Sequence, residues 1–413
     1  MSALENTLSL PAGAAASAGT LPRSARAVLA LFERIGHGAL EIRLPNGACL
    51  RFGESGQAAP AVLEIGRWSV FDSVLARGDV GFAEAWIDGQ WHSPDLTPLL
   101  TLLANNRALI SQAVYGQWWA LLTARLRHVF NANTRGGSRR NIMAHYDLGN
   151  DFYRLWLDPT MSYSSALYSG VADCSLAVAQ RVKYRRILRQ LDVRPGQRVL
   201  EIGCGWGGFA ELAAGEAGAQ VHGLTLSPAQ LDFARARMAR AGLQGRVQLE
   251  LCDYRDLHCA PFDHIVSIEM FEAVGERWWP SYFNTLKRLL KPDGRVAVQS
   301  ITIRDDLFAR YRKGTDFIQQ HVFPGGMLPS PSAFTREAAK AGLTVRDAFA
   351  FGPDYARTLA EWSAAFEREW PAIEQLGFDE RFRRVWRFYL AYCQAGFNSG
   401  CTEVMQFELG HTP

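Results

Sequence analysis

Hydrophobic and polar residues along the second half of the chain follow a pattern that switches repeatedly between two periods. Short apolar runs typical of buried strands are separated by longer segments whose apolar residues recur at helical spacing. Five such strand segments follow Asp192: RVLEI (198–202), QVHGLTL (220–226), VQLEL (247–251), DHIVSIE (263–269) and GRVAVQSITI (294–303). This alternation favours an α/β fold built on a doubly wound, mostly parallel sheet. The tail from about residue 338 is expected to be largely helical, and Val345–Phe351 could add a strand.

A smaller α+β unit is predicted for residues 22–105. The segment SARAVLALFERI (24–35) has the apolar spacing of a helix, and residues 39–53 read as a hairpin around Pro45-Asn46-Gly47. A chain of 413 residues is long for one core, so two domains are expected. Residues 1–21 are expected to form a disordered tail and not a signal peptide, because no basic segment precedes their small residues. No stretch of 18 uncharged apolar residues is found, so no membrane-spanning segment is predicted.

The region 106–140 is predicted to join the two domains. It begins as an amphipathic helix with Trp118 and Trp119, turns basic from Arg125 onward, and ends in a Gly-Gly-Ser linker. Tryptophan beside arginine suits the interface of an anionic membrane, whereas the alternative is an interdomain helix with a solvated basic face. Residues 141–413 are then the expected catalytic domain.

Composition changes this picture little. Hydrophobic residues make up 48% of the chain and charged residues 21%, with a net charge of +3, so the balance is that of a globular protein and gives no reason to expect a nucleic-acid partner. Seven cysteines occur without a CxxC pair. They are expected to be reduced thiols in a cytoplasm, and no metal site is predicted from them.

A glycine-rich loop follows the first strand of the second domain. In VLEIGCGWGGFA (199–210), the strand runs directly into Gly203, Gly205 and Gly208, and a helix follows. Such a loop fits NAD or FAD, S-adenosylmethionine, or a tight turn without ligand. Glu201 lies two residues before the first glycine, as in class I methyltransferases, and the second strand ends at Thr225 without the carboxylate that holds an NAD ribose. Both features favour S-adenosylmethionine.

Four further residues are candidates for contacts to this cofactor. Gln230 in LSPAQ could reach the ribose hydroxyls in place of the missing carboxylate, although an exposed helix position is the plainer interpretation. Asp253 and Tyr254 follow the third strand, where such folds contact the adenine, although Asp253 alone could equally cap a turn. Thr225 lies at the end of the second strand and completes the predicted set.

The segment Arg140–Tyr168 is rich in aromatic and polar residues but shows no stripe of either period, so neither an ordinary helix nor an ordinary strand is predicted. Together with other motifs it resembles the cyclopropane-fatty-acyl-phospholipid synthase family. The resemblance covers nearly the whole chain beyond residue 25. The motifs are HYDLGNDFYRLWLDPTMSYSSALY, VLEIGCGWGGFA, GLTLSPAQ, CDYRDL, IVSIEMFEAVG, YFNTLKRLLKPDGRVAVQSI, VFPGGMLPS, FGPDYARTLAEW and FYLAYCQAGF, with GFAEAWIDGQW resembling the N-terminal lipid-associated domain.

The resemblance implies an enzyme that moves a methyl group from S-adenosylmethionine to the double bond of a phospholipid acyl chain and forms a cyclopropane through a carbocation. It implies that Tyr163 and Ser164 touch the cofactor. It also implies a cytoplasmic protein, peripheral at the inner face of the membrane, and a homodimer. A bound bicarbonate would act as the base, and the residues matched to its surroundings are Glu272, Tyr355, Ser165, Gln299, Ile301 through its backbone, and Cys393 nearby.

Three positions depart from the family pattern. Ser165 replaces a frequent cysteine, Gln299 replaces a histidine ligand of bicarbonate, and Ala273 replaces a histidine. Serine and glutamine still form hydrogen bonds to an anion, but a group that could shuttle protons is lost. The carbocation could then lose a different proton and yield a methylene- or methyl-branched chain. A lipid-binding module without turnover is a further alternative of a different class.

Overall fold

The computed structural model describes residues 21–54, 59–108, 148–168, 170 and 173–412. The chain divides into two compact units, Met1–Thr123 with Glu380–Ala395, and Ala124–Asp379 with Gly396–Pro413. The predicted tail and nearly all of the predicted basic helix with Trp118, Trp119 and Arg125 lie outside the described residues. The functional roles assigned to the domains remain predictions.

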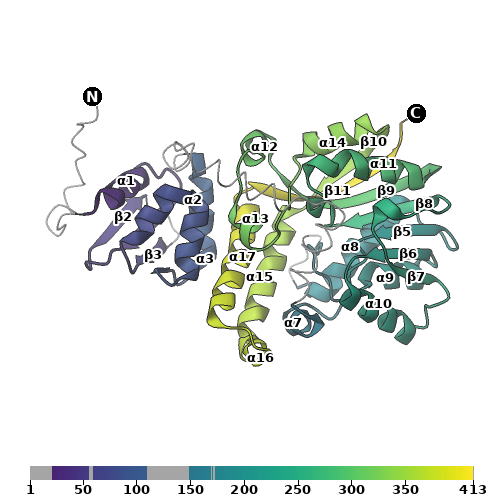
Figure 1. Cartoon of the computed structure of the whole chain (residues 1–413), viewed down its shortest axis with the longest axis horizontal. Coiled ribbons are helices and arrows are strands. Elements are labelled where there is room, and N and C mark those ends of the chain that lie inside the picture. Colours follow the sequence, from purple (N-terminus) through teal and green to yellow (C-terminus); the bar gives the residue numbers. More distant parts are fainter. Residues whose placement is uncertain (1–20, 55–58, 109–147, 169, 171–172, 413) are drawn as a thin grey trace. The chain divides into compact units, whose positions relative to one another are not determined.

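The N-terminal unit has a small four-stranded sheet in the order β2-β1-β3-β4 (Figure 1). The predicted hairpin is confirmed: β1 and β2 pair antiparallel around a turn in which Gly47 has a φ of 83°. Glycine adopts this left-handed conformation without steric cost. The elements are α1 (Arg23–Phe32), β1 (Ala39–Arg43), β2 (Cys49–Gly53), β3 (Ala61–Ile65), α2 (Ser69–Ile87), β4 (Trp91–His92) and α3 (Leu96–Asn105).

A helix from far along the chain completes this unit. Most of α17 (Glu380–Asn398) clusters with the N-terminal elements. Trp86 Nε1 donates to the backbone oxygen of Arg384 at 2.9 Å, Arg384 Nε donates to the backbone oxygen of Trp86 at 2.6 Å, and the guanidinium lies 4.2 Å from the centroid of the Trp86 ring. The sequence boundaries at residues 105 and 140 did not include this helix.

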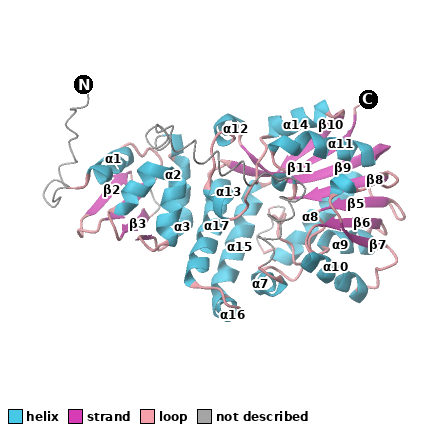
Figure 2. Ribbon diagram, in the orientation of Figure 1, coloured by secondary structure: helices cyan, strands magenta, loops and turns pink. Residues whose placement is uncertain are grey.

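The second unit is built on a seven-stranded sheet in the order β10-β11-β9-β8-β5-β6-β7 (Figure 2). The strands β5 to β9 run parallel, which confirms the predicted fold, and β10 and β11 are antiparallel additions. The strands are β5 (Arg198–Ile202), β6 (Gln220–Thr225), β7 (Val247–Leu251), β8 (Phe262–Ile268), β9 (Leu290–Ile303), β10 (Leu343–Ala350) and β11 (Thr402–His411).

Helices cover both faces of this sheet. One face packs Val199, Val221 and Val266 against α8, α9 and α10, whereas Leu200 and Val298 face the opposite core with α11 and α14. Alternate residues of each strand therefore serve two apolar layers. The helices are α7 (Asn150–Trp156), α8 (Leu176–Leu191), α9 (Gly208–Glu216), α10 (Pro228–Arg240), α11 (Trp279–Leu289), α12 (Asp305–Tyr311), α13 (Phe317–His321), α14 (Pro331–Lys340), α15 (Gly352–Arg368) and α16 (Trp370–Gln375), with short 3₁₀ turns at Tyr254–Asp256, Phe271–Ala273 and Glu276–Trp278.

Expectations about the tail and the aromatic segment are largely confirmed. The tail is mostly helical and β10 confirms the strand expected at Val345–Phe351, but β11, which lies between β9 and β10, was not predicted. Within the aromatic segment, Asn150–Trp156 form α7, a buried helix and not an ordinary surface helix. Its Phe152, Tyr153 and Trp156 are almost fully buried and contact one another. Tertiary burial of three rings outweighs the missing amphipathic stripe in so short a helix.

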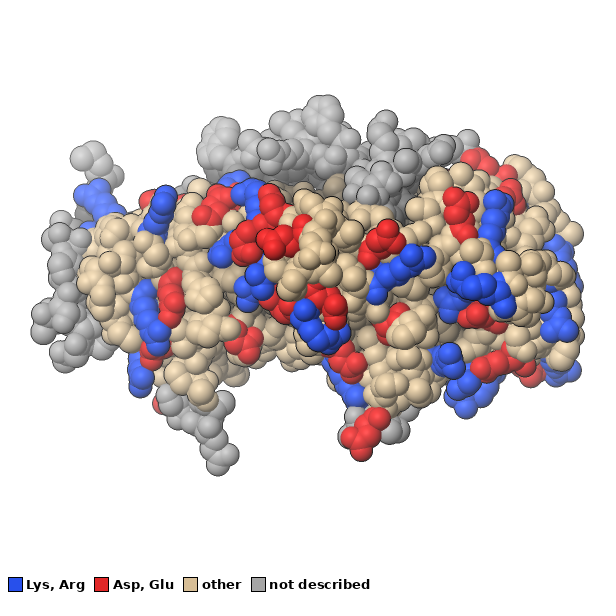
Figure 3. Space-filling model, turned by 90° about the horizontal axis from the view of Figure 1, so that it is seen from below, with Lys and Arg blue, Asp and Glu red and all other residues tan. Residues whose placement is uncertain are grey.

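Three global features bear on function. Among the described residues, no helix is long and apolar enough to cross a membrane. All seven cysteines are free thiols. On the face shown in Figure 3, basic and acidic side chains are interspersed, so that face has no extended patch of one sign.

Candidate functional site

The carboxyl ends of the parallel strands bring the predicted cofactor residues to one edge of the sheet. Glu201 and Ile202 of β5 pair with Gly223 of β6 and with Ser267 of β8, respectively. The loops that follow these strands therefore start side by side. In open α/β sheets, ligands bind outside the carboxyl ends of the strands, and this edge is the place to examine for a site.

The glycine loop turns tightly at this edge. Gly203, Gly205 and Gly207 have φ values of 84°, 51° and 82°, and α9 begins at Gly208. A Cβ at Gly203 would lie 3.0 Å from Met270 Cγ, so only glycine fits between the loop and the turn after β8. A Cβ at Gly205 would meet no atom within 4 Å, so the loop opens to free space there.

Glu201 has the properties expected of a residue that binds S-adenosylmethionine. Its side chain is 3% exposed, and its Oε2 atom has no hydrogen-bond partner within the part of the chain that the structure describes. Burial raises its pKa well above the ordinary value for glutamate. A buried acceptor without a partner is costly unless a ligand satisfies it. Together with the open space at Gly205, this atom fits a cofactor that presents hydroxyl donors.

Other predicted cofactor residues already have partners in the protein. Thr225 Oγ1 donates to Gln230 Oε1 at 2.9 Å, and Gln230 is 6% exposed and not the surface residue of the plainer interpretation. Asp253 accepts from the backbone N–H of Arg255 at 3.0 Å and pairs with its guanidinium at 2.5 Å. Asp253 thus caps the turn, as the alternative had it. Tyr254 packs edge-on against Tyr282. Their contacts to the cofactor remain predictions.

The segment after α7 lies beside the glycine loop. The ring of Tyr163 packs 5.4 Å from Tyr153, 5.6 Å from Trp156 and 5.3 Å from Trp362, measured between centroids. Ser164, the second residue implied to touch the cofactor, is buried, and both its side chain and its backbone accept hydrogen bonds. Its Oγ accepts from Lys183 Nζ at 2.6 Å, and its backbone oxygen accepts from the Gln180 amide at 2.9 Å.

Lys183 is a functional candidate that the sequence analysis missed. Its side chain is fully buried, and desolvation lowers its pKa to about 8, against the opposing charges of Glu269, Asp158 and Glu201. A lysine is buried in this way only where acids compensate its charge. The signal was present in the sequence, because Ala179, Lys183 and Ile187 share the buried stripe of α8.

Glu269 collects the groups that were expected to hold bicarbonate. Its Oε1 accepts from the backbone N–H of Ser165 at 2.8 Å and from Gln299 Nε2 at 2.7 Å, and its Oε2 accepts from the Tyr355 hydroxyl at 2.6 Å. These three residues were expected to surround a bicarbonate together with Glu272, and that role stays a prediction. Glu269 has a φ of 48°, which is unusual for a residue with a side chain and marks a backbone held by its surroundings.

Glu272 forms a second, separate carboxylate site. Its Oε1 accepts a short hydrogen bond from the backbone N–H of Ile301, the predicted backbone donor, and another from Ser300 Oγ at 3.0 Å. Its Oε2 has no partner among the described residues. Burial and then the charge of Glu269 raise the pKa of Glu272 to about 8.

The two carboxylates differ in the groups that surround them. Burial also raises the pKa of Glu269, but the Tyr355 hydroxyl, the charge of Lys183, the Ser165 N–H and Gln299 oppose that rise. When two acids share a site, the one with more donors ionises more readily. The surroundings therefore favour ionisation of Glu269 over that of Glu272. Glu269 also keeps a partly accessible side chain, as a group that meets a substrate requires.

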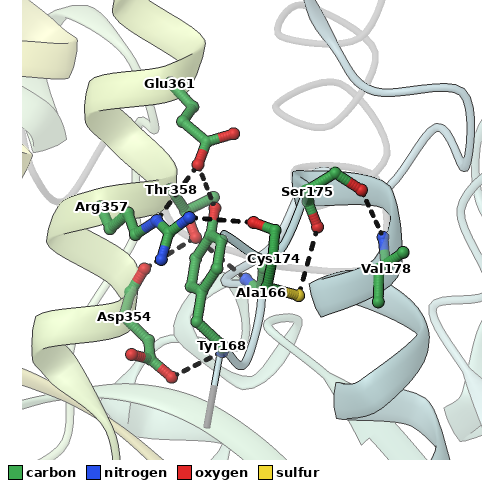
Figure 4. A network of polar contacts seen from close by, with 9 residues as sticks. All are labelled: Ala166, Tyr168, Cys174, Ser175, Val178, Asp354, Arg357, Thr358 and Glu361. Carbon is green, nitrogen blue, oxygen red and sulfur yellow. Dashed lines mark hydrogen bonds and ion pairs between the residues drawn. The ribbon is translucent and has the colours of Figure 1, made fainter. Parts of the chain in front are cut away.

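Helix α15 contacts the segment around Tyr168 (Figure 4). Tyr168 donates through its N–H to Asp354 at 2.8 Å and through its hydroxyl to Glu361 at 3.0 Å. The Arg357 guanidinium lies 3.8 Å from the centroid of the Tyr168 ring and donates to the backbone oxygen of Cys174 at 2.9 Å. These contacts join the helix that carries Tyr355 to the segment that follows Ser165.

Two implied residues remain without a site assignment. Ala273 follows Glu272 and offers no polar side chain. Cys393 lies on α17 in the part that belongs to the N-terminal unit, and its implied place near the base stays a prediction.

Known proteins share this arrangement. The family model described as mycolic acid cyclopropane synthetase matches residues 134–407. A tuberculostearic acid methyltransferase of Mycobacterium tuberculosis is 42% identical over 80% of this chain and 79% of its own length, and the cyclopropane-fatty-acyl-phospholipid synthase of Escherichia coli is 33% identical over 84% and 87%. The crystal structure of a mycolic acid cyclopropane synthase complexed with SAH and CTAB has 34% identity and a TM-score of 0.61 over 66% of this chain and 97% of its own. The chain therefore belongs to the cyclopropane synthase family of S-adenosylmethionine-dependent methyltransferases.

Proposed function

We propose that this protein transfers the methyl group of S-adenosylmethionine to the double bond of an unsaturated acyl chain in a membrane phospholipid, and that Glu269 then accepts a proton from the product cation. The observation that carries the proposal is the convergence of Ser165, Gln299 and Tyr355 on the Glu269 carboxylate. The phospholipid substrate is argued from the relative in Escherichia coli and from the motifs shared with its family.

S-adenosylmethionine, when bound, supplies an electrophilic methyl group. The residues to hold it are Glu201, whose unpartnered Oε2 can accept from a hydroxyl, and the glycine loop at Gly203–Gly208. Tyr163 and Ser164 would cover it from the other side. Because Lys183 and Gln180 fasten Ser164, this covering segment is held in place before the cofactor arrives.

The acyl chain needs a dry and π-rich place to react. An isolated alkene is a weak nucleophile, and its attack on the methyl group leaves a cation on the neighbouring carbon that water would trap. The rings of Tyr163, Trp156 and Trp362 lie within 6 Å of one another, and Tyr163 is the partly exposed member that would face the acyl chain over the two buried indoles. Aromatic faces stabilise cations without reacting with them.

Glu269 is suited to remove the proton. A general base works best when its pKa approaches the working pH; burial raises the pKa of Glu269, and the Tyr355 hydroxyl and the charge of Lys183 oppose that rise. In this proposal the side chain of Glu269 replaces the bicarbonate that the resemblance implied. The altered Gln299 fits this replacement, since its side chain donates to the carboxylate, whereas Ser165 donates through its backbone N–H.

Two products follow from different proton losses. If the transferred methyl group loses the proton, the new carbon bridges both alkene carbons and a cyclopropane forms. If a hydride first shifts between the two former alkene carbons, proton loss from the methyl group leaves a methylene branch, which a reductase could convert to a methyl branch. The departures at Ser165, Ala273 and Gln299, the internal base Glu269 and the 42% identical tuberculostearic acid methyltransferase favour the branched product.

Access to acyl chains requires contact with a bilayer. In our proposal the N-terminal unit and the segment with Trp118 and Arg125 dock on the anionic cytoplasmic face of the membrane, and the protein acts as a homodimer. The support is the composition of that segment, in which two adjacent indole rings are followed by arginines over a short distance.

The test is expression in a bacterium that lacks cyclopropane fatty acids, followed by mass spectrometry of its phospholipid acyl chains. We expect a new species one CH₂ heavier than a monounsaturated chain, absent with E269Q and present with the surface control E276Q. Catalytic hydrogenation converts a methylene branch but spares a ring. Purified enzyme should not depend on added bicarbonate. No new species from the folded, cofactor-binding protein would overturn the proposal and favour a binding module.

A further inference from the structure

A continuous chain of hydrogen bonds links Glu269 to an arginine on the outer side of the sheet. Gln299 Nε2 donates to Glu269 at 2.7 Å, Gln406 Nε2 donates to Gln299 Oε1 at 2.9 Å, and Arg186 Nη1 donates to Gln406 Oε1 at 2.6 Å. The four side chains come from α8, β11, β9 and the end of β8. None of the motifs that identify the cofactor loop includes Arg186 or Gln406.

The order of donors and acceptors in this chain admits one arrangement only. An arginine has no acceptor, so it requires the amide oxygen of Gln406 and leaves the Gln406 N–H to face Gln299. That N–H in turn requires the oxygen of Gln299, which leaves the Gln299 N–H for Glu269. Through Gln406, Arg186 thus determines the orientation of the Gln299 amide.

The sheet holds the two glutamines directly opposite each other. Gln406 of β11 pairs with Gln299 of β9, and both side chains are fully buried. No water can compete for their amide groups at such positions, and an apolar pair would be the ordinary choice for the interior of a sheet. Burial of two adjacent amides costs free energy, so a pair without a catalytic role would stabilise these strands less than an apolar pair.

Arg186, at the outer end of this chain of hydrogen bonds, is also held in place. The Arg186 guanidinium lies 4.0 Å from the centroid of the Phe349 ring, 3.5 Å from Asp347 Oδ2 and 3.2 Å from Gln190 Oε1. Its side chain is 20% exposed. These contacts hold the planar group in one orientation, so it can act as a fixed donor.

We propose that Arg186 and Gln406 are positioning residues that keep the Gln299 N–H directed at Glu269, so that this carboxylate stays ionised and ready to accept a proton. The inference rests on the proposed role of Glu269 as the base. If the chain of bonds is broken, Gln299 can rotate and present its oxygen to the carboxylate, which favours the protonated form of Glu269.

Other charged groups also face Glu269 and must stay constant in any test. Lys183 of α8 and the Tyr355 hydroxyl of α15 favour its ionised form, whereas Glu272 is a second acid close by. The charges of Glu201 of β5 and of Asp158 also act on Lys183. A variant at Arg186 or Gln406 changes none of these side chains.

The first experiment measures kcat against pH for R186M, with R189M as a matched control. Arg189 is an exposed residue of the same helix, so R189M removes the same charge without touching the chain of bonds. We expect the acidic limb of the R186M profile to move up by about one pH unit, so that kcat at a fixed pH on that limb falls about tenfold. R186K retains a donor and should restore most of the loss. Equal shifts in R186M and R189M, or an unmoved R186M profile, would overturn the proposal.

A second pair of variants avoids dependence on turnover. In Q406E the new carboxylate accepts from both sides and turns the Gln299 N–H away from Glu269, whereas Q406M only removes the contact. We therefore expect Q406E to raise the midpoint of the Glu269 carboxyl band, assigned in infrared difference spectra by its loss in E269Q, more than Q406M does. The reverse order would refute the chain of bonds even if methyl transfer is confirmed. If the wild type transfers no methyl group, the proposed function fails while the spectra still decide the orientation of Gln299.

Discussion

The glycine loop and the two-carboxylate site lie at the same edge of the sheet, but they are assembled in opposite ways. The loop is local: Glu201 and the glycines that follow it occupy eight consecutive positions, 201–208. The carboxylate site is not. The donors to Glu269 come from positions 104, 86 and 30 residues away along the chain. One site depends on backbone conformation, and the other depends on the packing of four distant elements.

This difference separates two tasks of the enzyme. Backbone N–H groups and glycine turns bind a cofactor that many proteins share, and the arrangement tolerates change elsewhere in the fold. In the proposed reaction, proton removal depends on the pKa of Glu269, and that pKa depends on every polar group around it. Members of one family can therefore keep the first site and alter the chemistry through the second.

The largest effect should come from E269Q, which leaves the shape of the site but removes the proton acceptor. We expect methyl transfer to fall by about 10²–10⁴-fold, the usual contribution of a general base. S-adenosylhomocysteine binding, measured by calorimetry, should be unchanged. The control is E276Q at a surface residue that pairs with Arg312. If E269Q retained activity near that of the wild type, a group other than Glu269 would be the base.

The second prediction concerns a substitution that alters the glycine loop and leaves Glu269 and Glu272 unchanged. In G203A a side chain must adopt a φ of 84° and contact Met270 at about 3 Å. Such strain costs about 1–3 kcal/mol, so S-adenosylhomocysteine affinity should fall by about 5- to 150-fold. G245A is the matched control, because a Cβ there meets nothing within 4 Å. Equal affinities for the two variants would contradict the assignment of the loop.

A third prediction concerns the stability that Glu272 confers. Its pKa is raised from an ordinary 4.5 to about 8, so the folded protein holds a proton through that window that the unfolded chain releases. The stability from this group is present below pH 4.5 and is lost as the pH rises through 8. Relative to E272Q, the wild type should lose about 2–4 kcal/mol of unfolding free energy between pH 5 and pH 8. Urea unfolding at both pH values measures this, and parallel curves would show that Glu272 ionises normally.

The smallest effect is expected at the contact between Tyr168 and α15. Y168F removes the hydrogen bond to Glu361 and should cost about 0.5–1.5 kcal/mol of stability. The exposed hydroxyl pair of Thr344 and Thr412 supplies the control T344V, with an effect close to zero. Thermal denaturation of the two variants gives the comparison. A larger loss in T344V would show that the segment around Tyr168 is not fastened by this contact.

Sequence patterns predicted the parallel sheet and the glycine loop, because both follow from periodicity and from residues close together in the chain. The family resemblance also selected Ser165, Gln299 and Tyr355, as residues around a bicarbonate, but did not indicate that they contact Glu269. Glu269 stands at the end of a strand segment, where a glutamate is unremarkable until the fold brings three donors to it. Strand β11 was missed because it lies in a tail that was expected to be largely helical.

The position of β11 has a consequence for how the protein is made. This strand inserts between β9 and β10 and carries Gln406 opposite Gln299. A nascent chain that has not yet released residues 402–411 from the ribosome has an open gap in its sheet and an unsupported amide beside Glu269. Its cofactor loop, by contrast, was synthesised some 200 residues earlier. Translation thus builds the part that captures the methyl donor long before the part that completes the reaction, and a prematurely terminated product could bind the donor but not turn it over.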